Sequence, residues 1–174
     1  SFPSLLNSGM LIKLFDPEGN LVSFVNYLDS WYPEGSTVGG TSLERIDPQN
    51  IAEGKQNWHV SADSQGGTPG KVNSVVGSNP DITIPFVSYV EVLSAGKLRI
   101  GFSEPMDTLS ITLNQNYYFG DEDINPQVIV VSGSLFDAVD VSLSDNMQAG
   151  ETYWLSLNNM FDFAGNVMPS TQVK

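Results

Sequence analysis

The sequence predicts an all-β chain built from two β-sandwich modules in tandem, and three observations favour this fold class. Short runs of alternating apolar and polar residues recur along the 174 residues, which is the pattern of strands that bury one face. The 16 glycines and 10 prolines separate these runs and favour turns between them. No stretch of about a dozen residues keeps the three-and-four spacing of apolar side chains that an amphipathic helix needs.

The first module, residues 1–80, is expected to start with a hairpin. Its two strands are predicted in MLIKLF (10–15) and NLVSFVNY (20–27), on either side of Asp16-Pro17-Glu18-Gly19, where glycine permits the positive φ of a tight turn. A further strand is predicted in TSLERI (41–46), which Asp47-Pro48 ends. The small, polar, proline-bearing segment at 75–85 is interpreted as a linker to the next module.

The second module, residues 81–174, shows the clearest strand pattern. In KLRIGF (97–102), the side chains of Leu98, Ile100 and Phe102 are expected on one face. Further strands are predicted in QVIVVSG (127–133), FDAVDVSL (136–143) and TYWLSL (152–157). Short strands at regular spacing with turn residues between them predict packed antiparallel sheets.

Charge and composition exclude several classes of function. The chain has 7 basic and 20 acidic side chains and a formal net charge of −13. No nucleic-acid partner is expected, because such binding requires Lys and Arg to neutralise phosphates. No apolar stretch reaches the roughly 20 residues of a membrane-spanning helix, so no membrane insertion is expected. Cysteine is absent, which excludes disulfides and thiol catalysis and fits an exported bacterial protein.

Residues 2–75 carry a distinctive order of phrases: NSGMLIKLFDPEGNLVSFVNY, DSWYP, GTSLERIDPQN and NWHVSADSQGGTPGKVNS. This order resembles the C-terminal part of a bacterial lamin-tail domain. The resemblance implies an immunoglobulin-like sandwich that here lacks its N-terminal strands. Because unpaired sheet edges attract further strands, one expectation is an edge-paired or strand-swapped dimer. The other is that the second module packs against the gap.

The second module is similar to the bacterial Ig-like domains of surface-layer and other exported proteins. The phrases that carry the similarity are LRIGFSEPMD (98–107), AGETYWLSL (149–157) and FDFAGNVM (161–168). The resemblance implies an immunoglobulin-like sandwich with a turn at Asp162, Gly165 and Asn166. It also implies a spacer, stalk or adhesive role, with other modules of the same protein, a cell-surface protein or a glycan as partners. An extracellular or cell-surface location is expected, with the signal peptide outside this chain.

Polar residues of the first module that could support catalysis are interpreted as structural. His59 is the only histidine, and the sequence has no G-x-S-x-G elbow. The stretch GGTPGK (66–71) departs from a phosphate loop, because three residues rather than four precede Gly-Lys and Val72 follows. Glu44 and Arg45 are neighbours in a predicted strand and are expected on opposite faces. No catalytic residue is assigned, and the chain is predicted not to be an enzyme.

Two ligand sites are hypotheses of the sequence. Asp121, Asp123 and Asn125 match the first half of an EF-hand loop, whose alternate oxygens bind calcium, although Pro126 replaces its glycine. Calcium is the one cofactor considered. Trp31 and Tyr32, in the DSWYPEG loop, are candidates for stacking against a glycan. An accessory region of a larger secreted hydrolase is a further alternative.

Overall fold

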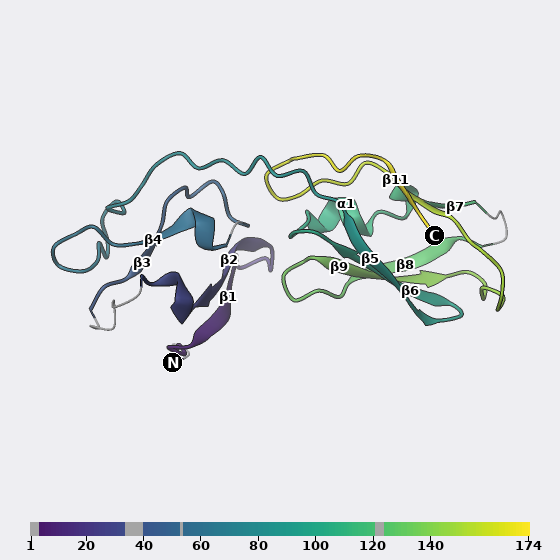
Figure 1. Cartoon of the computed structure of the whole chain (residues 1–174), viewed down its shortest axis with the longest axis horizontal. Helices are drawn as coiled ribbons and strands as arrows, with labels where there is room; N and C mark the ends of the chain where they lie inside the picture. Colours follow the sequence, from purple (N-terminus) through teal and green to yellow (C-terminus); the bar gives the residue numbers. More distant parts are fainter. Residues whose placement is uncertain (1–3, 34–39, 53, 121–123) are drawn as a thin grey trace. The chain divides into compact units, whose positions relative to one another are not determined.

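The structure is a computed structural model and describes residues 4–33, 40–52, 54–120 and 124–174. The described chain is nearly all β, as predicted, with eleven strands, one short α-helix and three 3-10 turns. It divides into two compact units, Ser1–Asp81 and Ile82–Lys174. Figure 1 draws the strands and helices of both units, coloured along the sequence.

The first unit contains two small antiparallel sheets. Strands β1 (Gly9–Phe15) and β2 (Leu21–Leu28) form the predicted hairpin. Gly19 has a φ of +88°, and its N–H donates to the Asp16 carbonyl at 3.0 Å. Strands β3 (Leu43–Arg45) and β4 (Trp58–Val60) form the second pair, with Arg45 opposite Trp58. The 3-10 turns η1 (Asp29–Trp31) and η2 (Lys55–Asn57) follow β2 and precede β4.

Side-chain hydrogen bonds hold the long loops of the first unit. Asn57 is fully buried, and its amide group donates to the carbonyls of Asp47 and Asn50 at 2.8 and 2.7 Å. The Asp47 carboxylate accepts the N–H of Asn79 at 2.8 Å. These bonds satisfy backbone groups that have no partner in a sheet. They therefore fix the paths of loops that contain no strands.

The first unit has a small apolar core. Phe24 is the single buried hydrophobic side chain among its described residues, whereas the second unit buries 17. On the hairpin, Leu14, Phe15, Val22 and Leu28 are each about half exposed. Since burial of apolar surface is the main favourable contribution to folding, the first unit has much less of this contribution than the second.

The second unit is a sandwich of two antiparallel sheets. One sheet has the order β5 (Val87–Ser94), β6 (Lys97–Phe102), β9 (Ala138–Leu143), β8 (Pro126–Val131). The other has the order β11 (Thr171–Val173), β10 (Leu155–Leu157), β7 (Tyr117–Phe119). Inward side chains of both sheets join one hydrophobic core, which is the arrangement predicted for packed sheets.

The predicted alternation in β6 is confirmed. Leu98, Ile100 and Phe102 are 4%, 0% and 5% exposed and belong to the shared core. The strand predicted at 152–157 is shorter than expected, because only Leu155–Leu157 pairs with neighbours. Tyr153 still packs against the core, and its hydroxyl accepts the N–H of Gln148 at 2.9 Å.

A short helix, α1 (Thr108–Thr112), follows the FSEPMD phrase. Asp107 caps it by accepting the Ser110 N–H at 2.7 Å. The 3-10 turn η3 (Asn114–Asn116) then leads into β7. Five residues are too few to produce a helical period in the sequence, which is why this helix was not predicted.

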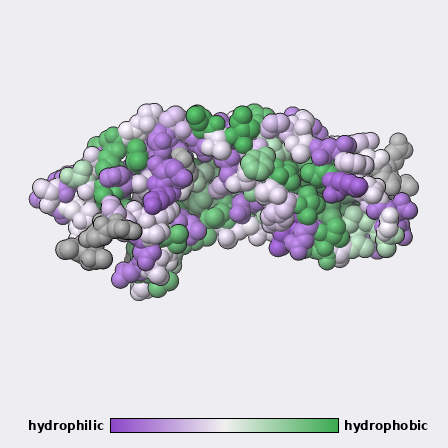
Figure 2. All heavy atoms as spheres, viewed as in Figure 1, coloured by the Kyte–Doolittle hydropathy of each residue, from purple (hydrophilic) through white to green (hydrophobic). Residues whose placement is uncertain are grey.

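Apolar residues also reach the surface. On the face drawn in Figure 2, hydrophobic side chains lie among hydrophilic ones in both units. Tyr89, Val92 and Leu93 of the edge strand β5 are among the exposed ones. In the part of the chain that the structure describes, no helix has the length and apolar character needed to cross a membrane.

Candidate functional site

Glu44 joins strand β3 to the closing loop, which we define as residues 61–74 after β4. Glu44 is 5% exposed, and its carboxylate accepts the Thr68 hydroxyl at 2.5 Å. It also accepts the N–H and the hydroxyl of Ser74, both at 2.7 Å. These bonds, that from Thr68 foremost, outweigh the opposing effect of burial and lower the pKa of Glu44 to about 2. A carboxyl that is ionised at neutral pH is a poor general acid, so its contacts are structural.

His59 and the glycine loop are also used locally. His59 is exposed in β4, and its Nδ1 lies 2.8 Å from the Val60 carbonyl oxygen. Gly66 has a φ of +81°, and its carbonyl accepts the Ser42 N–H at 2.7 Å. Residues 66–71 form turns beside β3 and lead into no helix. A phosphate loop needs a helix N-terminus there, so the local structure differs from such a loop.

Arg45 points away from Glu44, as strand geometry predicts, and links β3 to β2. Its Nη1 donates to the Ser23 hydroxyl at 2.8 Å and its Nη2 to the Phe24 carbonyl at 3.0 Å. Its guanidinium carbon lies 4.9 Å from the centroid of the Trp58 ring, within range of a cation–π contact. Burial lowers the pKa of Arg45.

Two buried donors remain unmatched at this contact. Arg45 Nε and Trp58 Nε1 are buried and have no hydrogen-bond acceptor in the described part of the chain. No ion pair of Arg45 is found in the described part of the chain, in contrast to Lys97 and Arg99, which pair with Asp140 in the second unit. The contact of Arg45 with Trp58 was not predicted, because the opposition of residues 45 and 58 depends on the register of β3 and β4.

A groove opens beside these donors, and we call it the Arg45 groove. It has a volume of about 350 Å³. Its apolar lining comes from the hairpin, through Ile12, Leu14, Phe24 and Val25, and from Pro48 and Trp58. A second hollow, of about 760 Å³, lies along β3 and shares Arg45, Trp58 and Asn73 with the groove.

The predicted glycan residues Trp31 and Tyr32 make contacts inside the first unit. The Trp31 ring is half-buried, and its centroid lies 6.4 Å from that of Trp58, with 42° between the ring planes. The Tyr32 hydroxyl donates to the Thr41 carbonyl at 3.2 Å. These contacts account for the position of both rings, and stacking against a sugar stays a prediction.

Two of the three predicted calcium ligands, Asp121 and Asp123, lie outside the described residues. The third, Asn125, is described. Its N–H donates to the Ser144 hydroxyl at 2.9 Å, and its carbonyl accepts the Ser144 N–H at 2.8 Å. The calcium site therefore stays a prediction.

Asp162 forms the turn that the Ig-like resemblance implies. Its Oδ1 accepts the N–H groups of Ala164 and Asn166, both at 2.8 Å, and its Oδ2 accepts the Asn166 amide at 2.7 Å. Gly165 has a φ of +89°, which completes the tight turn. This turn was expected from the resemblance that the phrase FDFAGNVM (161–168) carries.

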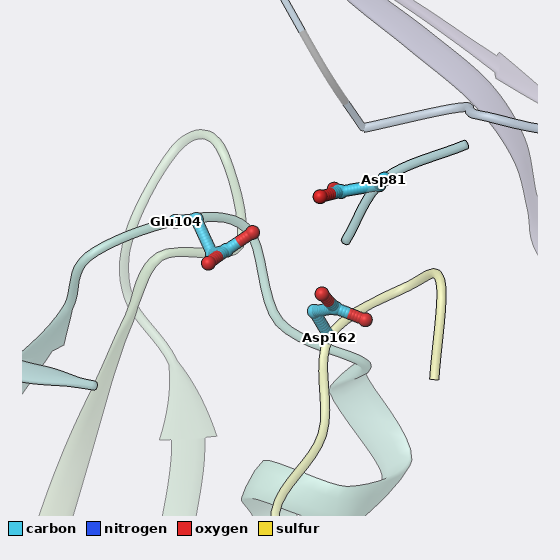
Figure 3. Close-up of side chains that lie close together, drawn as sticks. All are labelled: Asp81, Glu104 and Asp162. Carbon is cyan, nitrogen blue, oxygen red and sulfur yellow. The ribbon is translucent and has the colours of Figure 1, made fainter. Parts of the chain in front are cut away.

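Glu104 lies near Asp162, and this proximity was not predicted. A carboxylate oxygen of Glu104 is within 4.8 Å of one of Asp162, and Figure 3 draws the two with Asp81, the last residue of the first unit. Carboxylate oxygens are the ligands that calcium prefers. No sequence motif joins these residues, because they lie in separate loops after β6 and after β10.

Asp140 is the centre of a charge cluster on the outer face of the larger sheet. Arg99 Nε and Nη2 donate to its two carboxylate oxygens at 2.7 and 3.2 Å, and Lys97 Nζ lies 2.8 Å away. The Arg99 bonds foremost hold the pKa of Asp140 well below its usual range. This cluster links β6 to β9, and its charges pair with one another.

The second unit has an apolar hollow of about 430 Å³ at one edge of its sandwich. The hollow is lined by Val90 and Leu98 of the larger sheet and by Leu155 and Val173 of the smaller one, with Tyr153 beside them. These side chains belong to the core or pack against it. The hollow is therefore a continuation of the core, and most of its lining residues are apolar.

Comparison with known proteins gives distant similarity. No family model matches the chain, and no curated protein matches it. A structure of domains 1–6 of surface layer protein SbsC is 22% identical, with a TM-score of 0.48, and covers 52% of this chain and 13% of that one. A structure of the N-terminal part of the bacterial S-layer protein SbsC is 23% identical, with a TM-score of 0.47, and covers 52% of this chain and 22% of that one. The present chain thus spans less than a quarter of these solved chains.

Proposed function

We propose that this chain is a non-catalytic, structural part of an exported or cell-surface bacterial protein, in which its two units act as spacer or adhesion modules. The observation that carries the proposal is the use of the polar side chains. The Glu44 carboxylate accepts hydrogen bonds from the closing loop, and that of Asp162 accepts them from its own turn. The Asp140 carboxylate on β9 pairs with the side chains of Arg99 and Lys97 on the neighbouring strand β6. Carboxylates engaged in this way stabilise loops and sheets and are not available for proton transfer to a substrate.

The absence of cysteine and the lamin-tail and Ig-like resemblances support an extracellular location. The negative net charge of −13 supports solubility and repulsion from anionic surfaces. We propose other modules of the same protein, a cell-surface protein or a glycan as the partners.

The test is mechanical. A spacer must resist force, so pulling single full-length chains should give two unfolding events, one for each unit. The units have 81 and 93 residues, so the events should release up to about 290 and about 330 Å at roughly 3.6 Å per residue. Extension without a force peak would contradict a spacer role. The non-catalytic assignment would be contradicted if the chain hydrolysed a glycan or peptide substrate and if Glu44→Gln or Asp162→Asn abolished that hydrolysis.

Glycan binding by Trp31 and Tyr32 remains a second proposal from the sequence. Trp31→Ala should abolish binding on a glycan array, because it removes the ring proposed to stack on the sugar. Trp154→Ala, at an exposed tryptophan of the other unit, should leave binding unchanged. A role as an accessory region of a larger secreted hydrolase would need a catalytic domain elsewhere in the full-length protein.

A further inference from the structure

We propose that the first unit accepts an extended strand of another polypeptide in the Arg45 groove, and that this strand presents an acidic side chain to Arg45 among alternating apolar residues. The partner is defined by its chemistry: an acidic, apolar strand that is not a second copy of this chain. This inference goes beyond the spacer function, because it assigns a binding site and a class of ligand.

The described part of the first unit has an incomplete core. With Phe24 as the one buried hydrophobic side chain in the described part of the unit, Leu14 lines the groove and is still 58% exposed. The groove, at about 350 Å³, is larger than the roughly 150 Å³ cavity that admits benzene. It therefore has room for more than one apolar side chain.

The strands of the first unit also have open backbone edges. Within the described residues, β1 pairs with β2 alone and β3 with β4 alone, so each strand has an edge that no other strand covers. Two-stranded sheets are of marginal stability by themselves, and uncovered edges bind extended peptides through main-chain hydrogen bonds. An added strand would extend a sheet and place alternate side chains into the groove.

The charge of Arg45 complements an acidic ligand. Arg45 is partly buried without a carboxylate partner in the described part of the chain. Its Nε and the adjacent Trp58 Nε1 are buried donors without acceptors. Unsatisfied donors are costly to bury, and a carboxylate would satisfy both the charge and the hydrogen bond. A second copy of the chain is the alternative occupant, and sedimentation tests it.

The experiment selects ligands with the full chain. Immobilised protein is panned against displayed random ten-residue peptides, and recovered peptides are synthesised and titrated into isotope-labelled full chain. We expect recovered peptides to alternate apolar residues and to carry Asp or Glu at one fixed position. Binding should shift the amide signals of β1–β4 and slow their hydrogen exchange. Replacing the acidic residue of a peptide by its amide should weaken binding about tenfold or more, because it removes a charge-assisted hydrogen bond.

Matched protein variants locate the contact. Arg45→Gln should weaken binding of the acidic peptides by a similar factor and abolish the preference for acid over amide. Lys71→Gln removes the same charge from an exposed position of the same unit and should change affinity less than about twofold. If Arg45→Gln fails to fold, the comparison of acid and amide peptides on the unaltered chain decides the question.

Three outcomes would overturn the proposal. The first is no enrichment of peptides, and the second is equal affinity for acid and amide peptides. The third is a dimer that forms with increasing protein concentration in sedimentation and that, without peptide, slows hydrogen exchange of the β1–β4 amides. A second copy of the chain would then occupy the groove.

Discussion

The Glu44 carboxylate and Ser74, 30 residues apart, are joined by two hydrogen bonds of 2.7 Å each. One comes from the Ser74 N–H and the other from its hydroxyl. Strand β3, which carries Glu44, has three residues and pairs with β4 alone among the described strands. Attachment of the closing loop to β3 therefore depends on one ionised side chain as well as on main-chain pairing.

The first prediction is that the first unit loses stability as the pH falls from about 4.5 to about 2. The pKa of Glu44 is lowered from its ordinary value of 4.5 to about 2 in the folded unit. The unfolded chain therefore takes up the proton first, and the contribution of Glu44 is complete above about pH 4.5 and disappears as the pH approaches 2. Urea unfolding at several pH values measures this, with fluorescence restricted to Trp31 and Trp58 by Trp154→Phe.

Two variants separate the effect of Glu44 from that of other carboxylates. Glu44→Gln should lower the melting temperature by several degrees at pH 7 and make the dependence on pH shallower. Glu18→Gln, at an exposed position of the hairpin turn, should leave both nearly unchanged. A pH dependence that is the same in Glu44→Gln and in the unaltered chain would contradict this account.

The second prediction contrasts two glycines of the closing loop. Gly66 and Gly70 both have positive φ, +81° and +72°. A Cβ at Gly66 would lie 1.8 Å from the Gly40 carbonyl oxygen, whereas a Cβ at Gly70 meets nothing within 4 Å. Gly70→Ala should cost about 1 kcal/mol, from φ alone, and Gly66→Ala about 3 kcal/mol or more, because backbone must move. Chemical denaturation compares them, and equal losses would refute the close approach.

The strands that sequence predicts best are those with one buried face. The alternation of Leu98, Ile100 and Phe102 predicted β6, and Asp16 to Gly19 predicted the turn between β1 and β2. The strand predicted at 152–157 is shorter in the structure, because only Leu155–Leu157 pairs with β7 and β11. The local sequence pattern predicts that a segment tends to form a strand, but the length of that strand depends on pairing partners far away in the sequence.

The candidate sites were less predictable for the same reason. Arg45 contacts Ser23, Phe24 and Trp58, and no spacing within one segment encodes these contacts. Glu104 approaches Asp162 through two separate loops. By contrast, Asp162, Gly165 and Asn166 lie within five residues, and the resemblance to bacterial Ig-like domains implied the turn that they form. Turns held by local hydrogen bonds could therefore be predicted from the sequence, whereas contacts formed by the packing of segments distant in the sequence could not.

The third prediction concerns the core of the second unit. Leu157 is fully buried in β10, so Leu157→Ala should lower the free energy of unfolding of this unit by about 2–5 kcal/mol through a cavity and lost burial. Leu109→Ala makes the same change at a side chain that is 75% exposed, and its effect should stay within about 0.5 kcal/mol. Hydrogen exchange of β6 and β9 amides measures both. Similar losses in the two variants would contradict the assigned core.

The last prediction tests calcium binding at Asp121, Asp123 and Asn125. If these oxygens bind the ion, millimolar calcium should raise the melting temperature of the second unit, because a ligand that binds only the folded state stabilises it. Asp123→Ala should abolish the rise. Glu104→Gln removes a carboxyl near Asp162, and it should leave the rise in melting temperature unchanged if the ion binds at 121–125. If Glu104→Gln abolishes the rise and Asp123→Ala does not, the ion binds instead at the loops after β6 and β10. Calorimetric scans with calcium and with magnesium decide between these results, and no calcium-dependent shift in the unaltered chain would eliminate the site.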